Sequence, residues 1–270
     1  MNNTQEIRMI ASDIDGTLVP EGTGAINPEY FEIIKKLKDR GIRFAAVSGR
    51  NYNSVAKLFA PVLDDIYLIL ENGGWILEGS RTLFTRTFQR ETVCGITAAA
   101  EKMDNISAFI AHTMEGIYVW SKDPSIVRMM EEGYHNVCFP VKSREDMKDV
   151  PLDIFEMSVY VDGDPARAHV PLDEGMAPDV SQAVAGAHWI DMMPAEVNKG
   201  DGLRKLCGHM EIGTEETLAF GDNKNYIPLL LAAGEAWCVE EAAEEVKKTA
   251  GRIVGSLSDD AVLKHIKQYL

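Results

Sequence analysis

Two carboxylates one residue apart, Asp13 and Asp15, follow a short apolar run and precede Gly16 and Thr17. The run, residues 7–11, is typical of a buried parallel strand, and ligands of open α/β sheets bind just beyond the carboxyl ends of such strands. Two neighbouring acids repel each other, and a divalent cation such as Mg²⁺ would offset that repulsion. Gly16 permits a tight turn whose amides can point at an anion. The same residue types also form an ordinary solvated turn, so this segment alone leaves both interpretations open.

The composition narrows the class of protein. The chain has 270 residues, 46% of them hydrophobic and 26% charged, as in globular proteins of one large or two ordinary domains. The formal net charge of -15 argues against nucleic acid as a partner, and it also opposes an anionic ligand. A phosphate site would therefore need local positive charge from a metal ion, a lysine or helix amides.

Location and cysteine chemistry follow from the same sequence. No apolar run approaches the roughly 20 residues that span a bilayer, and the first six residues lack the order of a signal peptide. We therefore expect a cytoplasmic protein without membrane contact.

The four cysteines are too far apart for a disulfide framework or a zinc site, so we expect reduced thiols, mostly in the core: Cys94, Cys138, Cys207 and Cys238.

The next elements place a second polar group beside the first. Asn27 and the proline after it predict the start of a helix that ends near residue 41. Residues 42–47 form another apolar run, which ends at Ser48. A strand, a helix and a strand in this order form a right-handed crossover with parallel strands. Ser48 should therefore lie at the same sheet edge as Asp13.

The remaining pattern predicts a Rossmann-like parallel sheet. Asn-Gly at 72–73 predicts a hairpin that leads into a β-ribbon over residues 75–88. The last strand-end segment is Gly-Asp-Asn-Lys-Asn at 221–225. We predict further helices over 51–59, from Lys199 onward, over 227–233, over 240–250 and from a Ser258 cap to the C-terminus, and further strands over 66–70, 216–220 and 236–239.

Between these segments the sequence changes character. Residues 85–193 never repeat the pattern of a strand that ends in an acid or a hydroxyl. We predict an inserted α+β cap domain there, within a catalytic core formed by residues 1–84 and 194–270. Its expected elements are helices over 92–102 and 124–134 and strands over 116–120, 155–161 and 188–192, with a loop over 162–178.

Four segments thus end strands or begin helices at one sheet edge. Together they supply the parts of phosphoryl transfer, because a carboxylate can attack phosphorus and form an aspartyl-phosphate. Mg²⁺ and a lysine neutralise the transferring group, and a hydroxyl with backbone amides positions its oxygens. The segments carry Asp13 with Asp15, Ser48, Lys199, and Asp222 with Asn225.

In these segments the chain resembles the haloacid dehalogenase (HAD) superfamily, specifically the Cof-type phosphatases with a class IIB cap. The matching stretches are Asp-Ile-Asp-Gly-Thr-Leu at 13–18, Val-Ser-Gly-Arg at 47–50, Asn-Lys-Gly at 198–200 and Phe-Gly-Asp-Asn-Lys-Asn at 220–225. The resemblance covers nearly the whole chain in order, and it implies an α/β fold with a parallel-sheet core and an inserted cap.

The resemblance also implies roles for single residues. Asp13 would be the nucleophile and a Mg²⁺ ligand. Asp15 would protonate the leaving oxygen, then activate water, and contact the metal through its carbonyl. Asp222 would complete the protein's metal ligands. The phosphate would be held by the Ile14 amide, Ser48, the Gly49 amide, Lys199 and Asn225.

The chain departs from the family's pattern at one position, since Tyr226 stands where an aspartate usually follows the asparagine of the fourth segment. Because Asp222 is kept, we expect metal binding to survive. Arg50 is left outside the site, as a structural partner of a carboxylate. Taken singly, Ser48 could cap a helix and Lys199 could be an exposed lysine.

The function indicated is a Mg²⁺-dependent phosphomonoesterase that acts on a small phosphorylated metabolite, a sugar phosphate or a phosphorylated cofactor, with no obligate protein partner evident. A phosphomutase and a non-catalytic phosphoaspartate switch are the alternatives. Asp15 argues against dehalogenation, which has no use for an acid there. It also argues against a switch, because a water-activating group would shorten the life of the phosphoaspartate.

Overall fold

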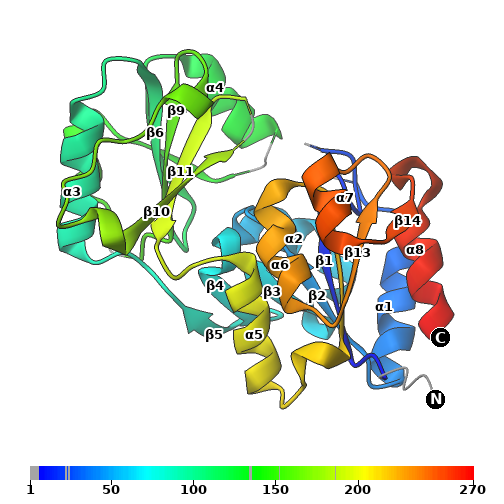
Figure 1. Cartoon of the computed structure of the whole chain (residues 1–270). Helices are drawn as coiled ribbons and strands as arrows, with labels where there is room; N and C mark the ends of the chain where they lie inside the picture. The colour runs from blue at the N-terminus through cyan, green and yellow to red at the C-terminus, as the bar shows by residue number, and fades with distance from the viewer. Residues whose placement is uncertain (1–5, 22, 24, 134–135, 152, 186) are drawn as a thin grey trace. The chain divides into compact units, whose positions relative to one another are not determined.

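The chain folds into two compact units, each described by itself (Figure 1). The computed structural model describes residues 6–21, 23, 25–133, 136–151, 153–185 and 187–270. The first unit contains residues 1–50, 55–85 and 198–270, and the second contains 51–54 and 86–197. The boundaries expected from the sequence lie at 84/85 and 193/194, while those of the compact units fall at 85/86 and 197/198.

The first unit is built on an eight-stranded sheet in the order β14-β13-β12-β1-β2-β3-β4-β5. The first six strands of that order are parallel, and the last two are antiparallel. The strands are β1 (Met9–Asp13), β2 (Arg43–Val47), β3 (Tyr67–Leu70), β4 (Trp75–Glu78), β5 (Arg81–Thr85), β12 (Thr217–Gly221), β13 (Glu235–Val239) and β14 (Ile253–Gly255).

The central strands are mostly apolar because the sheet has helices on both faces. All five residues of β1 are buried, and Asp13 at its end lies opposite Val47 of β2. On the other side of β1, Ser12 lies opposite Phe220, one residue before the end of β12. The expected parallel arrangement of these strands is therefore confirmed, and the strand ends that carry the acids and Ser48 meet at one edge.

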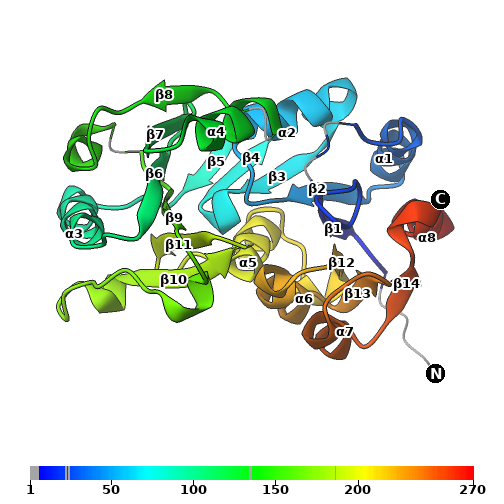
Figure 2. The ribbon, with the colours of Figure 1, turned by 90° about the horizontal axis from the view of Figure 1, so that it is seen from above.

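Helices cover both faces of this sheet. Right-handed crossovers place α1 and α2 on one face and α6 and α7 on the other, because the chain first moves from β1 toward β3 and later from β12 toward β14. Figures 1 and 2 show α5, α6 and α7 side by side, with α8 beside α1. The helices are α1 (Glu29–Asp39), α2 (Tyr52–Leu58), α5 (Lys199–His209), α6 (Ile227–Ala232), α7 (Glu244–Ala250) and α8 (Ala261–Ile266).

The predicted hairpin joins β3 to β4. Its turn is the short 3-10 segment η2 (Glu71–Gly73), in which Glu71 and Asn72 both have a positive φ. Asparagine tolerates this left-handed backbone better than most side chains, whereas glutamate adopts it at some cost. Such strain in a non-glycine residue often marks a functional position, and Asn72 takes part in the site described below.

The second unit contains a six-stranded sheet in the order β10-β11-β9-β6-β7-β8, and we refer to it as the cap. On one face, α3 and the 3-10 segment η4 (Glu145–Asp149) cover a core that includes Phe109 and Ala111. Ile110 points to the other face and packs there with Met130, beyond α4. The cap elements are α3 (Arg90–Glu101), α4 (Pro124–Arg128), β6 (Ile106–His112), β7 (Ile117–Ser121), β8 (Cys138–Pro140), β9 (Glu156–Val161), β10 (Val180–Ala185) and β11 (Trp189–Pro194).

Two predicted helix starts are wrong. The helix expected over 240–250 begins only at Glu244, because residues 240–242 form a turn in which the Ala242 amide donates to the Val239 carbonyl. The final helix is not capped by Ser258. The hydroxyl of Ser256 accepts from the Ser258 amide, and Asp260 is left-handed, so α8 begins after it. Short polar side chains here satisfy the backbone locally and delay the helix.

Other expectations meet the structure as follows. Four short strands, β6, β8, β10 and β14, were not predicted. The helix expected over 124–134 is α4 followed by a π-helical turn at Met129–Gly133, and its last residue lies outside the described ranges. All four cysteines are free thiols, but only Cys207 and Cys238 are buried. No helix in the described ranges combines the length and apolar character needed to cross a membrane.

Candidate active site

Asp13 is a fully buried carboxylate at the carboxyl end of β1. Its Oδ2 accepts a hydrogen bond of 2.8 Å from the Thr17 hydroxyl, and its Oδ1 accepts one of 2.6 Å from the Ile14 amide. The turn after β1 makes these contacts possible, because Gly16 adopts a φ of +79° that other residues rarely take. The nucleophile expected from the sequence is thus fixed by its own turn.

Asp222 follows β12 and faces Asp13. Burial, together with the neighbouring Asp222 charge, raises the pKa of Asp13 well above its usual range, and burial also raises the pKa of Asp222. The two carboxyl groups lie close enough to share a proton. Gly16 permits this approach, since a Cβ at that position would overlap Oδ2 of Asp222. The structure therefore places two acids together, and the Asp222 charge disfavours ionisation of the buried Asp13.

This pair fits a hard divalent cation. Oδ1 of Asp222 is buried and has no hydrogen-bond partner among the described residues. An acceptor-only oxygen in that position costs free energy unless a cation or a donor reaches it. Among the described residues no three His, Cys, Asp or Glu side chains cluster to hold a metal. A metal here would therefore rely on Asp13, Asp222 and oxygens other than side-chain carboxylates, such as the Asp15 carbonyl.

Replacing Asp222 with Asn should stabilise the metal-free protein, because it removes one of two repelling carboxylates and supplies an amide donor. We expect a gain of about 1 kcal/mol, or about 2–4 °C in Tm. Because the folded-state pKa values of Asp13 and Asp222 are raised, wild-type stability falls as pH rises from the ordinary aspartate pKa of about 4 toward those raised values, so the gain should be larger at neutral than at acid pH. Thermal unfolding in EDTA measures both effects.

The same variant should lose the stabilisation that excess Mg²⁺ gives the wild-type protein. Asp259→Asn, at an exposed position of the first unit, is the matched control and should keep it. Mg²⁺ stabilisation of wild-type size in Asp222→Asn would remove Asp222 from the metal ligands.

Asp15 is held by Arg50. The Nε of Arg50 donates to Oδ2 of Asp15 at 2.7 Å, and Nη2 donates to Oδ1, so the pair is bidentate. Nη2 also donates to the Thr23 carbonyl at 3.1 Å, and the Arg50 side chain is only 6% exposed. A bidentate guanidinium fixes the orientation of a carboxylate. Arg50, which the sequence analysis left outside the site, therefore contacts the expected acid–base residue directly.

Ser48 and Gly49 follow β2 directly. Ser48 is buried, and its Oγ accepts from the Arg50 amide at 3.0 Å. The hydroxyl thus keeps its own proton for another acceptor, such as a phosphate oxygen. Gly49 lies against Asn72, since a Cβ there would stand 3.3 Å from Oδ1 of Asn72. A helix-capping role for Ser48 does not match this geometry, because α2 begins four residues later.

Lys199 is 1% exposed at the first position of α5, after the Asn198 cap. It is therefore not the exposed lysine that the sequence left as an alternative. Its Nζ donates to Oδ1 of Asn72 at 2.7 Å and lies 4.0 Å from the centroid of the Tyr226 ring. The helix is held against η2 by close glycine contacts, because a Cβ on Gly73 would overlap the Asn198 carbonyl. These contacts bring the ammonium group into the same cluster as Asp13 and Asp222.

The structure supports two of the expected phosphate-binding groups, those of Ile14 and Asn225, less directly than the others. The Ile14 amide donates to Asp13 itself, and Asn225 is exposed on the 3-10 segment η8 (Lys224–Tyr226). Their roles stay predictions.

Three residues of the cluster, Thr17, Asn72 and Tyr226, had no assigned role in the sequence analysis, and Arg50 was expected only as a structural partner of a carboxylate. Thr17 and Arg50 lie inside the stretches that match the family, 13–18 and 47–50, so their position could have indicated that they belong to the site. Asn72 offered only a turn pattern, and its contact with Lys199 joins residues 127 positions apart. Tyr226 offered only its departure from the family's pattern.

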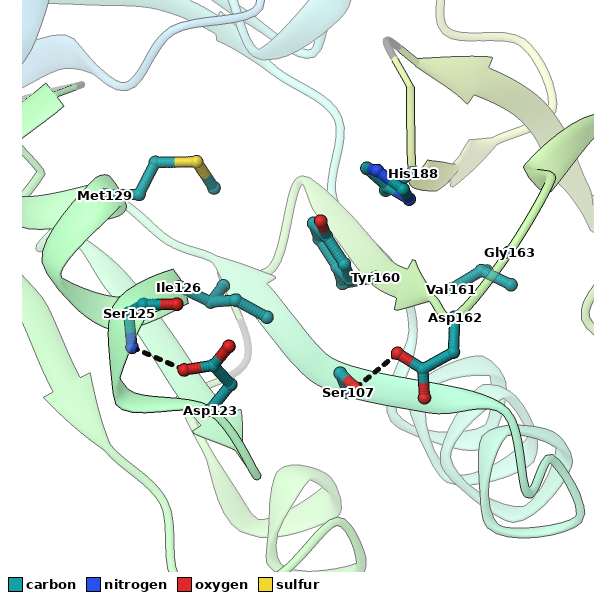
Figure 3. A pocket seen from close by; sticks show the side chains of 10 residues that line it. All are labelled: Ser107, Asp123, Ser125, Ile126, Met129, Tyr160, Val161, Asp162, Gly163 and His188. Atoms are coloured by element: carbon teal, nitrogen blue, oxygen red, sulfur yellow. Dashed lines mark hydrogen bonds between the residues drawn. The ribbon is translucent and has the colours of Figure 1, made fainter.

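The cap carries a pocket of about 400 Å³ that none of the expected site residues lines (Figure 3). The Tyr160 and His188 rings stack at a centroid distance of 4.8 Å, and Met129 lies across the opening from them. The Asp123 carboxylate accepts a hydrogen bond of 2.8 Å from the Ser125 amide, and the Asp162 carboxylate accepts one from the Ser107 hydroxyl. The pocket is a feature of the cap alone.

A family model of the haloacid dehalogenase-like hydrolases matches residues 10–266, and the chain belongs to this family. It is a phosphatase-type member of the Cof group, as the resemblance implied, with a parallel-sheet core and a cap of the subclass IIB kind. Phosphatases of this superfamily generally use a divalent metal.

Individual relatives agree with this assignment. The chain is 24% identical to the 5-amino-6-(5-phospho-D-ribitylamino)uracil phosphatase YbjI of Escherichia coli, over 98% of this chain and 96% of the relative. A crystal structure from Eubacterium rectale is 28% identical with a TM-score of 0.86, and covers 98% of this chain and 99% of its own. The subclass IIB sugar phosphatase BT4131 shares the fold with a TM-score of 0.78 at 21% identity, over 97% and 98% of the two chains.

Proposed function

We propose that the protein is a Mg²⁺-dependent phosphomonoesterase that hydrolyses small phosphorylated metabolites through an aspartyl-phosphate on Asp13. The observation that carries this proposal is the fully buried Asp13 with the partly buried Asp222 at the sheet edge, beside the Lys199 ammonium. A bound Mg²⁺ would neutralise charge on the transferring phosphoryl group, with Asp13, Asp222 and the Asp15 carbonyl as its protein ligands.

In the first step, an oxygen of the Asp13 carboxylate attacks phosphorus and the bond from phosphorus to the ester oxygen breaks. The leaving alkoxide takes a proton from Asp15, which becomes a carboxylate. Thr17 and the Ile14 amide fix the orientation of the Asp13 side chain before the substrate binds, so little of its conformational entropy is lost on binding. Ser48, Gly49 and Lys199 supply a hydroxyl, an amide and an ammonium for the phosphoryl oxygens.

In the second step, Asp15 takes a proton from water as the water oxygen attacks the phosphorus of the aspartyl-phosphate. The bond between phosphorus and the Asp13 oxygen breaks, which releases orthophosphate and restores both carboxyl groups. The bidentate pairing with Arg50 supports this step, because it fixes the orientation of the Asp15 carboxylate that accepts the proton.

The substrate class in this proposal is that of the relatives, namely phosphorylated sugars and phosphorylated precursors of cofactors. The cytoplasmic location predicted from the sequence fits such substrates and stays a prediction. The alkoxides of such substrates are poor leaving groups, so their protonation by Asp15 as a general acid should increase the rate strongly.

The proposal is tested by measuring orthophosphate release from a panel of such esters, including the phosphoribityl-aminouracil named for YbjI. We expect release from at least one ester with Mg²⁺ and none above background with EDTA. Return of an isomerised phosphate ester in place of orthophosphate would favour the phosphomutase. Release that is unchanged in EDTA would refute the Mg²⁺ dependence.

A further inference from the structure

Tyr226 occupies the centre of the cluster. It is 5% exposed at the end of η8, directly before α6. Its hydroxyl donates to the Val47 carbonyl at 3.3 Å, at the end of β2, and lies within reach of Asp13. Its Cβ packs on β12, because a Cβ added to Gly221 would lie 2.8 Å from it. One side chain thus touches the ends of three neighbouring strands.

The face of the ring contacts Lys199. The ammonium lies 4.0 Å from the ring centroid, and on another side Nζ donates to Asn72. These two contacts come from different segments, η8 and η2, so together they fix where the positive charge stands. An aromatic face attracts a buried cation through its quadrupole without carrying a formal negative charge.

That difference matters at a phosphate site. The usual aspartate would add a third acid beside Asp13 and Asp222 and would pair with Lys199. Both effects oppose a dianionic ligand, and the net charge of -15 already opposes it. With tyrosine, the ring holds the ammonium in place, and position 226 adds no further carboxylate.

We propose that Tyr226 is a positioning residue of the phosphate site, whose ring holds the Lys199 ammonium for an anion in place of a carboxylate. The inference rests on the proposed function for its relevance to catalysis, because the proposed function places the phosphate of the substrate beside Lys199. It concerns anion binding, which can be measured without turnover and without metal.

The probe is inorganic orthophosphate, titrated calorimetrically into the full chain in EDTA. Tyr226→Phe keeps the ring and should bind orthophosphate within about threefold of wild type. Tyr226→Leu removes the ring and should weaken binding about tenfold. Tyr226→Asp should weaken it at least as much and should bind Mg²⁺ more tightly, as measured by thermal shift. Lys199→Ala removes the ammonium group and shows how far the orthophosphate affinity falls when that group is absent.

Tyr30→Leu is the matched control, because Tyr30 is a buried tyrosine of α1 in the same unit. It should lower Tm and leave the orthophosphate affinity unchanged. If Tyr226→Leu does not fold, Tyr226→Asp provides the second variant without a ring. Circular dichroism establishes folding for each variant.

The inference is overturned if a folded ringless variant binds orthophosphate as wild type does, or if Tyr226→Phe loses as much as Tyr226→Leu. It is also overturned if the wild-type protein shows no measurable orthophosphate affinity. A wild-type protein that binds orthophosphate with the expected ring dependence, yet hydrolyses no ester, would count against the proposed function and leave this inference standing.

Discussion

Replacing Asp13 with Asn should reduce phosphate release from every ester by at least about 10⁴-fold, the scale of loss for a covalent nucleophile. The amide is nearly isosteric and its one oxygen can keep one of the two contacts that Asp13 accepts, from Thr17 or from the Ile14 amide, but that oxygen is a far poorer nucleophile toward phosphorus. Because burial and the Asp222 charge raise the pKa of Asp13, the variant should also be more stable than wild type in EDTA at neutral pH. Steady-state kinetics and thermal unfolding measure the two effects.

This combination of lost activity and gained stability separates a nucleophile from a structural residue. A structural aspartate would lower both quantities when replaced. Asp39→Asn, at the exposed end of α1, should change neither and serves as the control. Wild-type turnover in Asp13→Asn would end the proposal of an aspartyl-phosphate enzyme.

Replacing Asp15 with Asn should reduce turnover of sugar phosphates by about 10³-fold, within the range for loss of a general acid and base. The effect should depend on the leaving group. With p-nitrophenyl phosphate, whose leaving group needs no proton, the first step survives and the second stalls. We expect a burst of p-nitrophenol equal to the enzyme concentration, followed by slow release, whereas an alkyl phosphate should give no burst. Rapid mixing with absorbance detection measures both.

Arg50→Lys supplies the comparison for this prediction, because it keeps the charge beside Asp15 but not the bidentate geometry. It should slow turnover of all esters without a burst, since Asp15 itself remains. Equal losses for p-nitrophenyl and alkyl phosphates in Asp15→Asn, with no burst, would contradict the acid–base role. A wild-type phosphoenzyme that lasts for minutes and turns over no ester would instead favour the phosphoaspartate switch.

Much of the first unit could be predicted because its central strands are short, mostly apolar and followed by polar residues. The run before Asp13 and the run before Ser48 specify buried strands, and the helix between them forces the two strands to be parallel. The hairpin at Asn72 followed from an Asn-Gly pair. Less was visible in the cap, where β6, β8 and β10 gain their stability from neighbouring strands rather than from a local pattern.

Interactions of side chains from distant segments could not be predicted. Arg50 was expected from the sequence to pair with a carboxylate, and only the folded chain shows that this carboxylate is Asp15 and that two donors of Arg50 reach it. The glycine at 16 fitted a turn, but the approach of Asp222 across it is a tertiary contact. Local propensity carries no information about which distant side chain fills such a space.

The sequence by itself determined which chemical groups this protein brings to the sheet edge, because strand ends and helix starts are set by local pattern and parallel crossovers have one hand. The tertiary structure alone decided how those groups are held: Asp15 by a guanidinium, Lys199 between an amide oxygen and the ring of Tyr226, and Asp13 beside a second, partly buried acid. Such contacts join residues far apart in the chain. They depend on burial and close packing, which exist only once the strands have assembled.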